Sequence, residues 1–332
     1  MIALSLVLCL VANALHHQVA ADGVERRLLL GHGAAPGNPR SLAADEFASL
    51  VSETTDGRLR VQVFGAETFG SDSEMMVSVA SGTLDITANS QGSFSVAVPE
   101  AGLFGLPFLF DSPEHAYAVI DGPVGDQIAA LAEEKGYHVL AWWDNGIRHT
   151  TNSRRPVEAP EDLKGLRIRT PDDPMTVAIF DELGANPTPM DFGELYLGLR
   201  QGAVDGQENP LVNIAASRLN EVQTELALTG HKYEVTPFLI STQTWDSLEE
   251  QDRQVLTEAA ASARDHQREL MAEQSEAILS EFEESLTVTE PDREALREAT
   301  AGVYDTYEKR YPELVDELRR TAEQTSPERS GS

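Results

Sequence analysis

The stretch Gly165–Leu211, GLRIRTPDDPMTVAIFDELGANPTPMDFGELYLGLRQGAVDGQENPL, contains the pattern that decides the fold of this 332-residue chain. Leu166 and Ile168 alternate with arginines, and this period of two predicts a short strand over 166–169. The strand stops before Pro171, because proline cannot donate a hydrogen bond within a sheet. A helix is expected to follow and to end at Gly184, since glycine often occupies the position just after a helix.

The second half of the same stretch predicts another helix and another strand. The helix runs from about Asp191 to Gly202, and a short strand is expected at Ala203–Asp205. Helices that alternate with short strands are typical of an α/β protein with parallel strands.

Polar side chains come directly after both predicted strands. Arg169 ends the first strand, and the cluster Gln207, Glu208 and Asn209 follows the second. Ligands of open α/β sheets bind beyond the carboxyl ends of the strands, so these residues are candidate binding residues. The planar guanidinium of arginine matches a carboxylate in a two-pronged way, which favours an acid as the ligand.

The N-terminal part of the chain predicts the order β-α-β-α-β, which implies a parallel sheet. The expected elements are a strand at Arg26–Gly31, a helix with Ala43, Phe47, Leu50 and Val51 on one stripe, a strand at Leu59–Phe64, a helix from about Ser73 to Gly82 and a strand at Leu84–Ala88.

Two segments of the chain resemble each other. Val77–Asp85 is VSVASGTLD and Leu197–Asp205 is LGLRQGAVD; in both, a helix ends at glycine and an aliphatic residue and aspartate follow. A polar cluster follows each copy, and in the first it consists of Asn89, Ser90 and Gln91. The echo indicates two α/β lobes of similar plan whose polar strand ends face one another across a cleft. The alternative is two unrelated uses of a common way to end a helix.

A long uninterrupted helix is expected near the C-terminus. Leu248–Ser285 contains no glycine or proline, and Ser247 and Glu250 have the spacing of a capping box. A helix of that length spans roughly 57 Å, more than one small domain. A further helical region is expected at Glu290–Leu318, followed by a polar, disordered tail from about Thr321.

Composition limits the classes of partner. The chain has 41% hydrophobic and 24% charged residues, which is ordinary for a soluble globular protein, and its length allows two domains. Its net charge of −30 argues against binding to nucleic acid or to anionic lipid, because both need a basic face. A small acid is still compatible, since surface charge is screened over roughly 8 Å. The excess of acid indicates either a well-solvated surface or a salt-adapted host.

The N-terminal segment is typical of a secretory signal. Residues 2–15 are apolar and a small-residue site follows near Val19-Ala20-Ala21, although no basic residue precedes them. The run is too short to span a membrane. The only cysteine, Cys9, lies inside it, so disulfides and thiolate chemistry are not expected in the mature chain.

The sequence lacks the common catalytic and cofactor motifs. Gly31–Gly37, GHGAAPG, follows a strand, but its third glycine is one residue late for a dinucleotide loop and Pro36 interrupts it. Neither G-x-S-x-G nor a phosphate-binding loop is present. Histidines are scattered. His149 could face the cleft, but a surface or packing role is favoured. We therefore expect no cofactor, no metal and no catalytic residue.

The chain resembles the extracytoplasmic solute-binding subunits of TRAP transporters, the DctP-type family. The motifs that carry the resemblance are Arg169-Thr170-Pro171, Gly184–Met190 (GANPTPM) and Val204–Leu211 (VDGQENPL). Three flanking segments also match, namely Phe108-Leu109-Phe110, Trp143–Arg148 and Asn220–Gln223. The resemblance runs from about Leu28 to Glu313.

The resemblance implies roles for particular residues. Arg169 matches the arginine that binds the ligand carboxylate, Asn209 the amide that meets the same carboxylate, and Arg148 a second basic contact. Phe192 matches an aromatic residue that packs on the ligand. The remaining expected contacts are Ser90 and Asn89 in the first lobe and Glu208 beside Asn209, with the GHGAAPG loop at the floor of the cleft. Arg167 is expected on a solvated face, and one of Trp142 and Trp143 to face the cleft.

The resemblance also implies the architecture. We expect a two-lobed, periplasmic-binding-protein-like α/β fold, in which each lobe is a mixed sheet flanked by helices and one long helix crosses both lobes. The expected parts are a signal peptide at 1–21, a first lobe of 22–145 plus 235–274, a second lobe of 146–234 plus 275–318, and a polar tail at 319–332.

The predicted function is capture of a small organic acid outside the cytoplasm and its delivery to the small and large membrane subunits of a TRAP transporter. The protein is expected to be a periplasmic monomer that is not an enzyme. The alternatives are a binding protein that serves a membrane receptor and an enzyme such as a carboxylic-acid lyase or isomerase.

Overall fold

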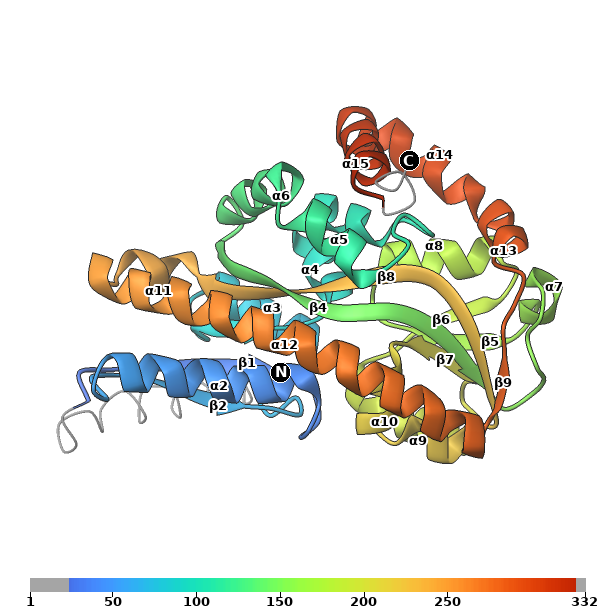
Figure 1. Cartoon of the computed structure of the whole chain (residues 1–332), viewed down its shortest axis with the longest axis horizontal. Coiled ribbons are helices and arrows are strands. Elements are labelled where there is room, and N and C mark those ends of the chain that lie inside the picture. Colours follow the sequence, from blue (N-terminus) through green and yellow to red (C-terminus); the bar gives the residue numbers. More distant parts are fainter. Residues whose placement is uncertain (1–23, 327–332) are drawn as a thin grey trace.

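Two lobes lie side by side and are joined by two long strands and one long helix (Figure 1). The computed structural model describes residues 24–326. The predicted signal peptide and Cys9 lie outside the described residues.

One sheet runs through both lobes. Its strands lie in the order β2-β1-β3-β8-β4-β7-β5-β6, and β9 pairs with β8. The strands are β1 (Arg26–His32), β2 (Leu59–Phe64), β3 (Ile86–Ala88), β4 (Tyr137–Asn152), β5 (Arg167–Thr170), β6 (Asn186–Pro189), β7 (Gly206–Asn209), β8 (Glu225–Ser241) and β9 (Thr287–Thr289).

The antiparallel strands β4 and β8 connect the lobes. The C-terminal part of β8 pairs with β3 in the first lobe, whereas the C-terminal part of β4 pairs with β7 in the second. The pairing of β4 with β8 shifts between Asp144 and Gly146, near the crossing between the lobes. This irregularity falls where the predicted boundaries, 145/146 and 234/235, divide the chain. Those boundaries remain a prediction.

The helices cover the sheet in layers on either side of this crossing. They are α2 (Pro39–Thr54), α3 (Asp72–Ala80), α4 (Gln91–Ala97), α5 (Pro113–Ile120), α6 (Pro123–Glu133), α7 (Pro160–Leu163), α8 (Pro174–Glu182), α9 (Phe192–Gln201), α10 (Leu211–Ala216), α11 (Thr242–Asp246), α12 (Glu250–Ser285), α13 (Arg293–Ala299), α14 (Ala301–Arg310) and α15 (Pro312–Thr325), with 3₁₀ turns at Pro99–Gly105 and Leu219–Val222.

The predicted internal echo is confirmed as a structural repeat. Gly82 and Gly202, 120 residues apart, both end their helices in the left-handed conformation, with φ of 72° and 69°. Each copy then buries an aspartate that holds the first strand of its own lobe. Asp85 accepts a hydrogen bond from the Leu29 N–H at 2.8 Å, and Asp205 accepts one from the Arg167 N–H at 3.0 Å.

The predicted long helix is confirmed, but its expected cap is wrong. α12 contacts α2 and β4 at one end and α10 and β9 at the other, so it crosses both lobes. It begins at Glu250 after Glu249, without a side-chain cap. Ser247 instead donates to the Thr244 carbonyl oxygen at 2.6 Å, because it ends the short helix α11.

The predicted polar tail is wrong between residues 319 and 325, which belong to α15. Val315, Leu318 and Ala322 form a buried stripe on this helix. The stripe packs on the core next to α5, and the His115 ring nitrogen Nε2 lies 2.8 Å from the Ala322 carbonyl oxygen. Tertiary packing therefore orders a segment whose overall composition is polar. Within residues 24–326, no helix is long and apolar enough to cross a membrane.

Candidate functional site: a pocket between the lobes

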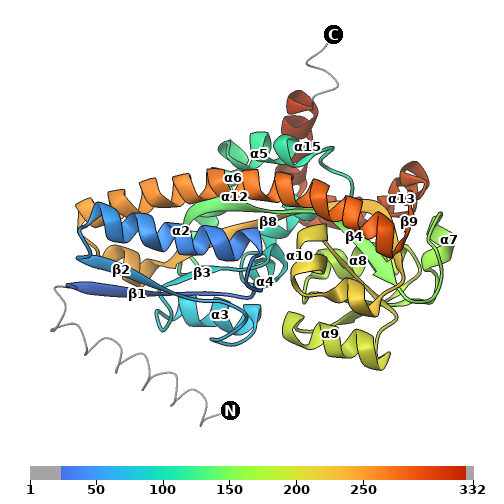
Figure 2. The same ribbon diagram turned by 60° about the horizontal axis from the view of Figure 1, so that its bottom comes forward.

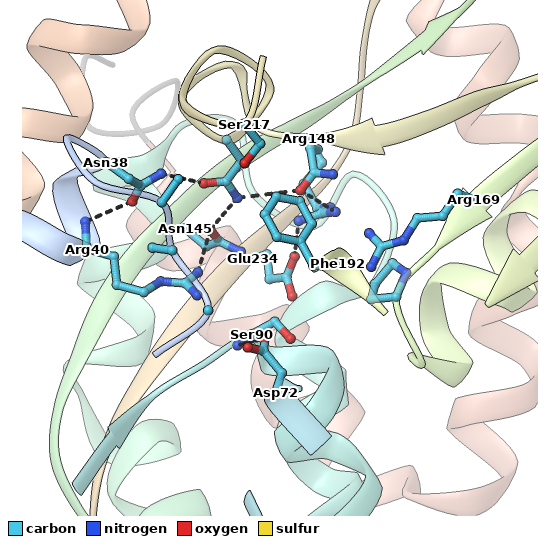
Figure 3. A pocket seen from close by; sticks show the side chains of 16 residues that line it. Asn38, Arg40, Asp72, Ser90, Asn145, Arg148, Arg169, Phe192, Ser217 and Glu234 are labelled. Carbon is cyan, nitrogen blue, oxygen red and sulfur yellow. Dashed lines mark hydrogen bonds and ion pairs between the residues drawn. The ribbon is translucent and has the colours of Figure 1, made fainter. Parts of the chain in front are cut away.

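A polar pocket lies between the two lobes (Figure 3). The first lobe contributes the loop after β1 and the starts of α2, α3 and α4, and the second lobe contributes the ends of β5 and β7 and the start of α9. The lining residues are Gly33, Ala34, Ala35, Asn38, Arg40, Asp72, Ser90, Asn145, Arg148, Arg169, Pro171, Phe192, Asn209, Asn213, Ser217 and Glu234.

Arg169 is a buried cation without an acidic partner. Its side chain is 3% exposed, and Nε and Nη2 both donate to the Met190 carbonyl oxygen, at 2.9 and 2.7 Å. No ion pair joins it to any carboxylate among residues 24–326, and burial lowers its pKa to about 10. The Phe192 ring lies 5.6 Å from the guanidinium. The Met190 contacts orient this guanidinium and leave Nη1 free for an anion.

Arg148 differs from Arg169, because two carboxylates already neutralise it. It forms ion pairs with Glu208 and Glu234, and Nη2 also donates to the Glu208 carbonyl oxygen at 2.7 Å and to Asn209 at 3.2 Å. Burial alone would lower the pKa of Arg148, but the two carboxylates outweigh burial and raise it. Of its five N–H groups, only one on Nη1 is left for a ligand.

The strand before Asn209 was predicted three residues too early. Residues 203–205 form a turn, and β7 is Gly206–Asn209, so the polar cluster belongs to the strand itself. Pairing decides this, since Gly206 packs against the Thr151 carbonyl oxygen, 2.2 Å from where a side chain would begin. Asn209 donates to Gln207 at 2.5 Å and accepts from Arg148, which fixes its amide at the pocket wall.

Five of the seven predicted contact residues line the pocket, and two lie behind its wall. Ser90, at the start of α4, reaches the pocket together with Arg148, Arg169, Phe192 and Asn209. Asn89 is fully buried and hydrogen-bonded to Thr87 at 2.7 Å. Glu208 is also fully buried, between Arg148 and His231.

Four further predictions from the sequence have different outcomes in the structure. Trp142 and Trp143 are both buried in hydrophobic cores on β4, so the prediction that one faces the cleft is wrong. His149 accepts from the Gly230 N–H at 3.2 Å, which confirms a packing role, and burial lowers its pKa to about 3. Arg167 is not merely solvated, because it forms an ion pair with Asp205. The GHGAAPG loop does lie at the pocket, through Gly33, Ala34 and Ala35.

Arg40 is a second buried cation, and sequence analysis missed it. It is 6% exposed and sits in the first turn of α2, where its Nη2 donates to Asn145 at 2.9 Å and to Thr236 at 3.0 Å. Its Nε has no partner among residues 24–326, and no carboxylate there forms an ion pair with it. The sequence signal that could have indicated Arg40 is Asn38, the N-cap residue of α2. This cap places the start of the helix, and with it Arg40, beyond the carboxyl end of β1.

The pocket also contains acidic and neutral polar groups that were missed. Asp72 and Glu234 line it, and Asp72 accepts from the Ser90 N–H at 3.0 Å. Amides and a hydroxyl complete the set: Asn38, Asn145, Asn213 and Ser217. These groups accept and donate hydrogen bonds, as hydroxyl-bearing ligands require.

The two lobes touch each other around the pocket. Asn38 of the first lobe donates to Asn213 of the second at 2.8 Å. The Glu67 carboxylate lies against Gly193, the second residue of α9, with Oε2 only 2.2 Å from where a Cβ would stand. A side chain at this position would therefore displace the Glu67 carboxylate from the start of α9.

This chain is similar to known proteins over most of its length. Residues 30–310 match one protein family, bacterial extracellular solute-binding protein, family 7 (DctP). The chain is 51% identical over 281 residues to the uncharacterised protein y4mM of Sinorhizobium fredii, a match that covers 84% of this chain and 52% of y4mM. The chain thus spans about half the length of that relative.

Two further relatives match over nearly their whole length. The 2,3-diketo-L-gulonate-binding periplasmic protein YiaO of Escherichia coli is 37% identical, over 89% of this chain and 91% of YiaO. The crystal structure of the sugar acid binding protein DctPAm of Advenella mimigardefordensis, in complex with galactonate, has a TM-score of 0.89 at 35% identity and covers 91% of this chain and 99% of that one. The present chain therefore belongs to family 7 of the bacterial extracellular solute-binding proteins, the DctP-type family of TRAP transporters.

Proposed function

We propose that this chain captures one small organic acid between its lobes, outside the cytoplasm, and delivers it to the small and large membrane subunits of a TRAP transporter. The observation that supports this most is Arg169, a buried cation that no carboxylate of residues 24–326 neutralises. Leaving such a charge unpaired inside a protein is costly, so an anionic ligand that enters the pocket supplies the missing partner. Both relatives with a named ligand bind an acid.

The charges of the pocket favour a monocarboxylate that carries hydroxyl groups. Three arginines line the pocket, but Arg148 is paired with Glu208 and Glu234. Arg148, Glu208 and Glu234 together carry one net negative charge. This charge and the charge of Asp72 balance the positive charges of Arg40 and Arg169. One added carboxylate at Arg169 is then tolerable, whereas a second one meets Asp72 and Glu234.

The non-ionic end of the ligand has matching partners in the first lobe. Asp72 accepts hydrogen bonds from hydroxyls, and Arg40 donates to hydroxyl or keto oxygens with its unpartnered Nε. Galactonate and 2,3-diketo-L-gulonate, named for the relatives, have this chemistry: one carboxylate and several hydroxyls.

Titration calorimetry with a small panel tests this proposal. Purified protein would be titrated with galactonate, gluconate and erythronate, with succinate as the dicarboxylate and with butyrate as the acid that lacks hydroxyls. We expect at least one of the sugar acids to bind at least tenfold more tightly than succinate or butyrate. A preference for succinate would contradict the assignment of hydroxylated monocarboxylates, and failure of every acid to bind would contradict the proposed function itself.

We also propose that the ligand leaves unchanged. The best acid of the panel would be incubated in molar excess over the protein, and the remaining acid would be quantified by mass spectrometry. Loss of more than one equivalent of acid would show turnover and favour the lyase or isomerase alternative.

A further inference from the structure

The two helices at the mouth of the pocket are equivalent parts of the internal repeat. α3 in the first lobe and α9 in the second lie along the same edge of the molecule (Figure 2). Their N-terminal ends lie at the same pocket, since Asp72 at the start of α3 and Phe192 at the start of α9 both line it. Any change in the separation of the lobes therefore changes the separation of these two helices.

Both helices expose a large apolar side chain at the same position of the repeat. Only four large hydrophobic residues within 24–326 are clearly exposed, namely Leu42, Val77, Val96 and Leu197. Val77 on α3 is 69% exposed, and Leu197, 120 residues later on α9, is 52% exposed. Packing within either lobe does not use these side chains, and their coincidence in the repeat sets them apart from Leu42 and Val96.

An exposed glutamate precedes each of these residues by three positions. Glu74 and Val77 share one face of α3, and Glu194 and Leu197 share one face of α9, because residues three apart are neighbours on a helix. We call the four residues the mouth surface. It consists of two copies of an acidic and apolar pair, and the cleft lies between them.

We propose that the mouth surface docks on the integral membrane subunits of the transporter, which would present two apolar spots, each beside a lysine or arginine. This inference rests on the proposed function. Charge complementarity favours a partner with basic residues, because a glutamate lies beside each of the apolar residues Val77 and Leu197. A second copy of this chain is a poor occupant, because it would bring Glu74 and Glu194 against equal charges. One copy of the pair on each lobe also lets the partner distinguish closed from open protein.

Binding to the membrane subunits in lipid nanodiscs tests the surface. The small and large subunits encoded with this chain would be purified together, reconstituted in nanodiscs and immobilised for bio-layer interferometry, with galactonate present. We expect the double variant Val77→Ser/Leu197→Ser to bind at least about tenfold more weakly than the wild type, as loss of central apolar contacts implies. Glu74→Gln/Glu194→Gln, which keeps the cap of α3 intact, should weaken binding and reduce its dependence on salt.

Matched variants keep the outcome interpretable. Leu42→Ser/Val96→Ser removes the other two exposed apolar side chains, and Glu273→Gln/Glu276→Gln removes two exposed charges on α12; both should bind like the wild type. Acid binding by Val77→Ser/Leu197→Ser and by both control variants, measured by calorimetry, should be unchanged, because none of these side chains lines the pocket.

Three results would overturn the proposal. Wild-type affinity of Val77→Ser/Leu197→Ser would show that docking uses another surface, while the proposed function stands. Equal binding to empty nanodiscs would show attraction to lipid. No binding of the wild type to loaded nanodiscs, together with normal acid binding, would contradict the membrane partner itself and favour a receptor-linked role.

Discussion

The contrast between Arg148 and Arg169 shows how much a buried cation depends on its partners. Both guanidiniums line one pocket at almost the same exposure, 2% and 3%. Arg148 is held by Glu208 and Glu234 and is part of the framework of the site. Arg169 is held only by a carbonyl oxygen and keeps its charge available. The two residues should therefore respond differently to substitution.

Replacement of Arg169 should abolish most acid binding. A hydrogen bond to a charged group contributes roughly 1.5–3 kcal/mol, so Arg169→Ala should weaken binding by on the order of 100-fold or more. Arg169→Lys keeps the charge but loses the planar fork and should also bind poorly. Calorimetry with the best acid of the panel measures both effects.

Arg167→Ala is the control from the same strand. It should bind normally, although its lost contacts with Asp205 should lower the melting temperature, which is measured in parallel. Near-native affinity of a folded Arg169→Ala protein would contradict the role of Arg169.

Replacement of Arg148 should mainly reduce stability. Arg148→Met leaves Glu208 and Glu234 buried without their cation, and breaking a buried pair in this way costs about 3–5 kcal/mol. Urea unfolding without ligand measures the loss. Arg154→Met removes a mostly exposed partner of Asp205, 57% accessible, and should cost less than about 1 kcal/mol. Equal losses for the two variants would show that Arg148 is not a framework residue.

At the scale of elements, the loop between β2 and α3 touches the first turn of α9 and connects the lobes. Glu67 of this loop lies against Gly193 and is close to Asp72, Asp191 and Arg169. Burial and the two aspartates raise its pKa to about 7, while the Gly193 N–H and Arg169 oppose the shift. The pKa of Asp191 is raised as well, by burial, Glu194 and Glu74. These contacts make the approach of the lobes sensitive to pH.

Acid affinity should fall as pH rises from about 5 to 8. The pKa of Glu67 is raised from its ordinary value of 4.5 to about 7 in this structure. The part of this rise that comes from Asp191 and from burial against α9 arises only on closure. Closure therefore takes up protons, so it is favoured at low pH and becomes weaker up to about pH 7. Calorimetry at a series of pH values should show a decrease of up to roughly tenfold, screened by solvent. Glu67→Gln should flatten most of this slope, whereas exposed Glu273→Gln should not. An equal slope in both variants would assign the pH dependence to other groups.

At the scale of the whole molecule, the structure corresponds to the closed arrangement. Asn38 bonds to Asn213 across the cleft, and Glu67 reaches α9. The elements β4, β8 and α12 run from one lobe into the other as long continuous segments. The lobes also pack on each other directly, through α4 and α8. A ligand that contacts both lobes stabilises the closed form at the expense of an open one.

Acid binding should therefore compact the protein. Small-angle scattering of the ligand-free protein should give a larger radius of gyration than the structure, and saturating acid should reduce it to the value calculated from the structure. Gly193→Ala, whose methyl group collides with Glu67, should remain more open at the same acid concentration. An unchanged radius in the wild type would mean that the pocket is closed before the ligand arrives.

The sequence by itself determined the order of elements and the position of Arg169, the residue that we propose binds the anion. Local rules were sufficient for the short strand β5 that carries Arg169, for the glycines that end α3 and α9, and for the long α12, because period and helix-stopping residues act over a few positions. β5 itself ends one residue later than predicted, at Thr170. The repeated aspartates also predicted two similar lobes. Rules of this kind failed at α15, where a buried stripe overrides a polar composition, and at β7, where pairing with β4 sets the strand.

Only the tertiary structure decided which charges meet. Glu208 and Glu234 lie 60 and 86 residues from Arg148, and the register of β4 with β7 and β8 brings them together. Arg40 enters the pocket because α2 starts at the crossing of the lobes, next to Asn145 and Thr236. A linear pattern shows which residues are polar, but the charge that remains available to a ligand depends on every group that folding places within a few ångströms of it.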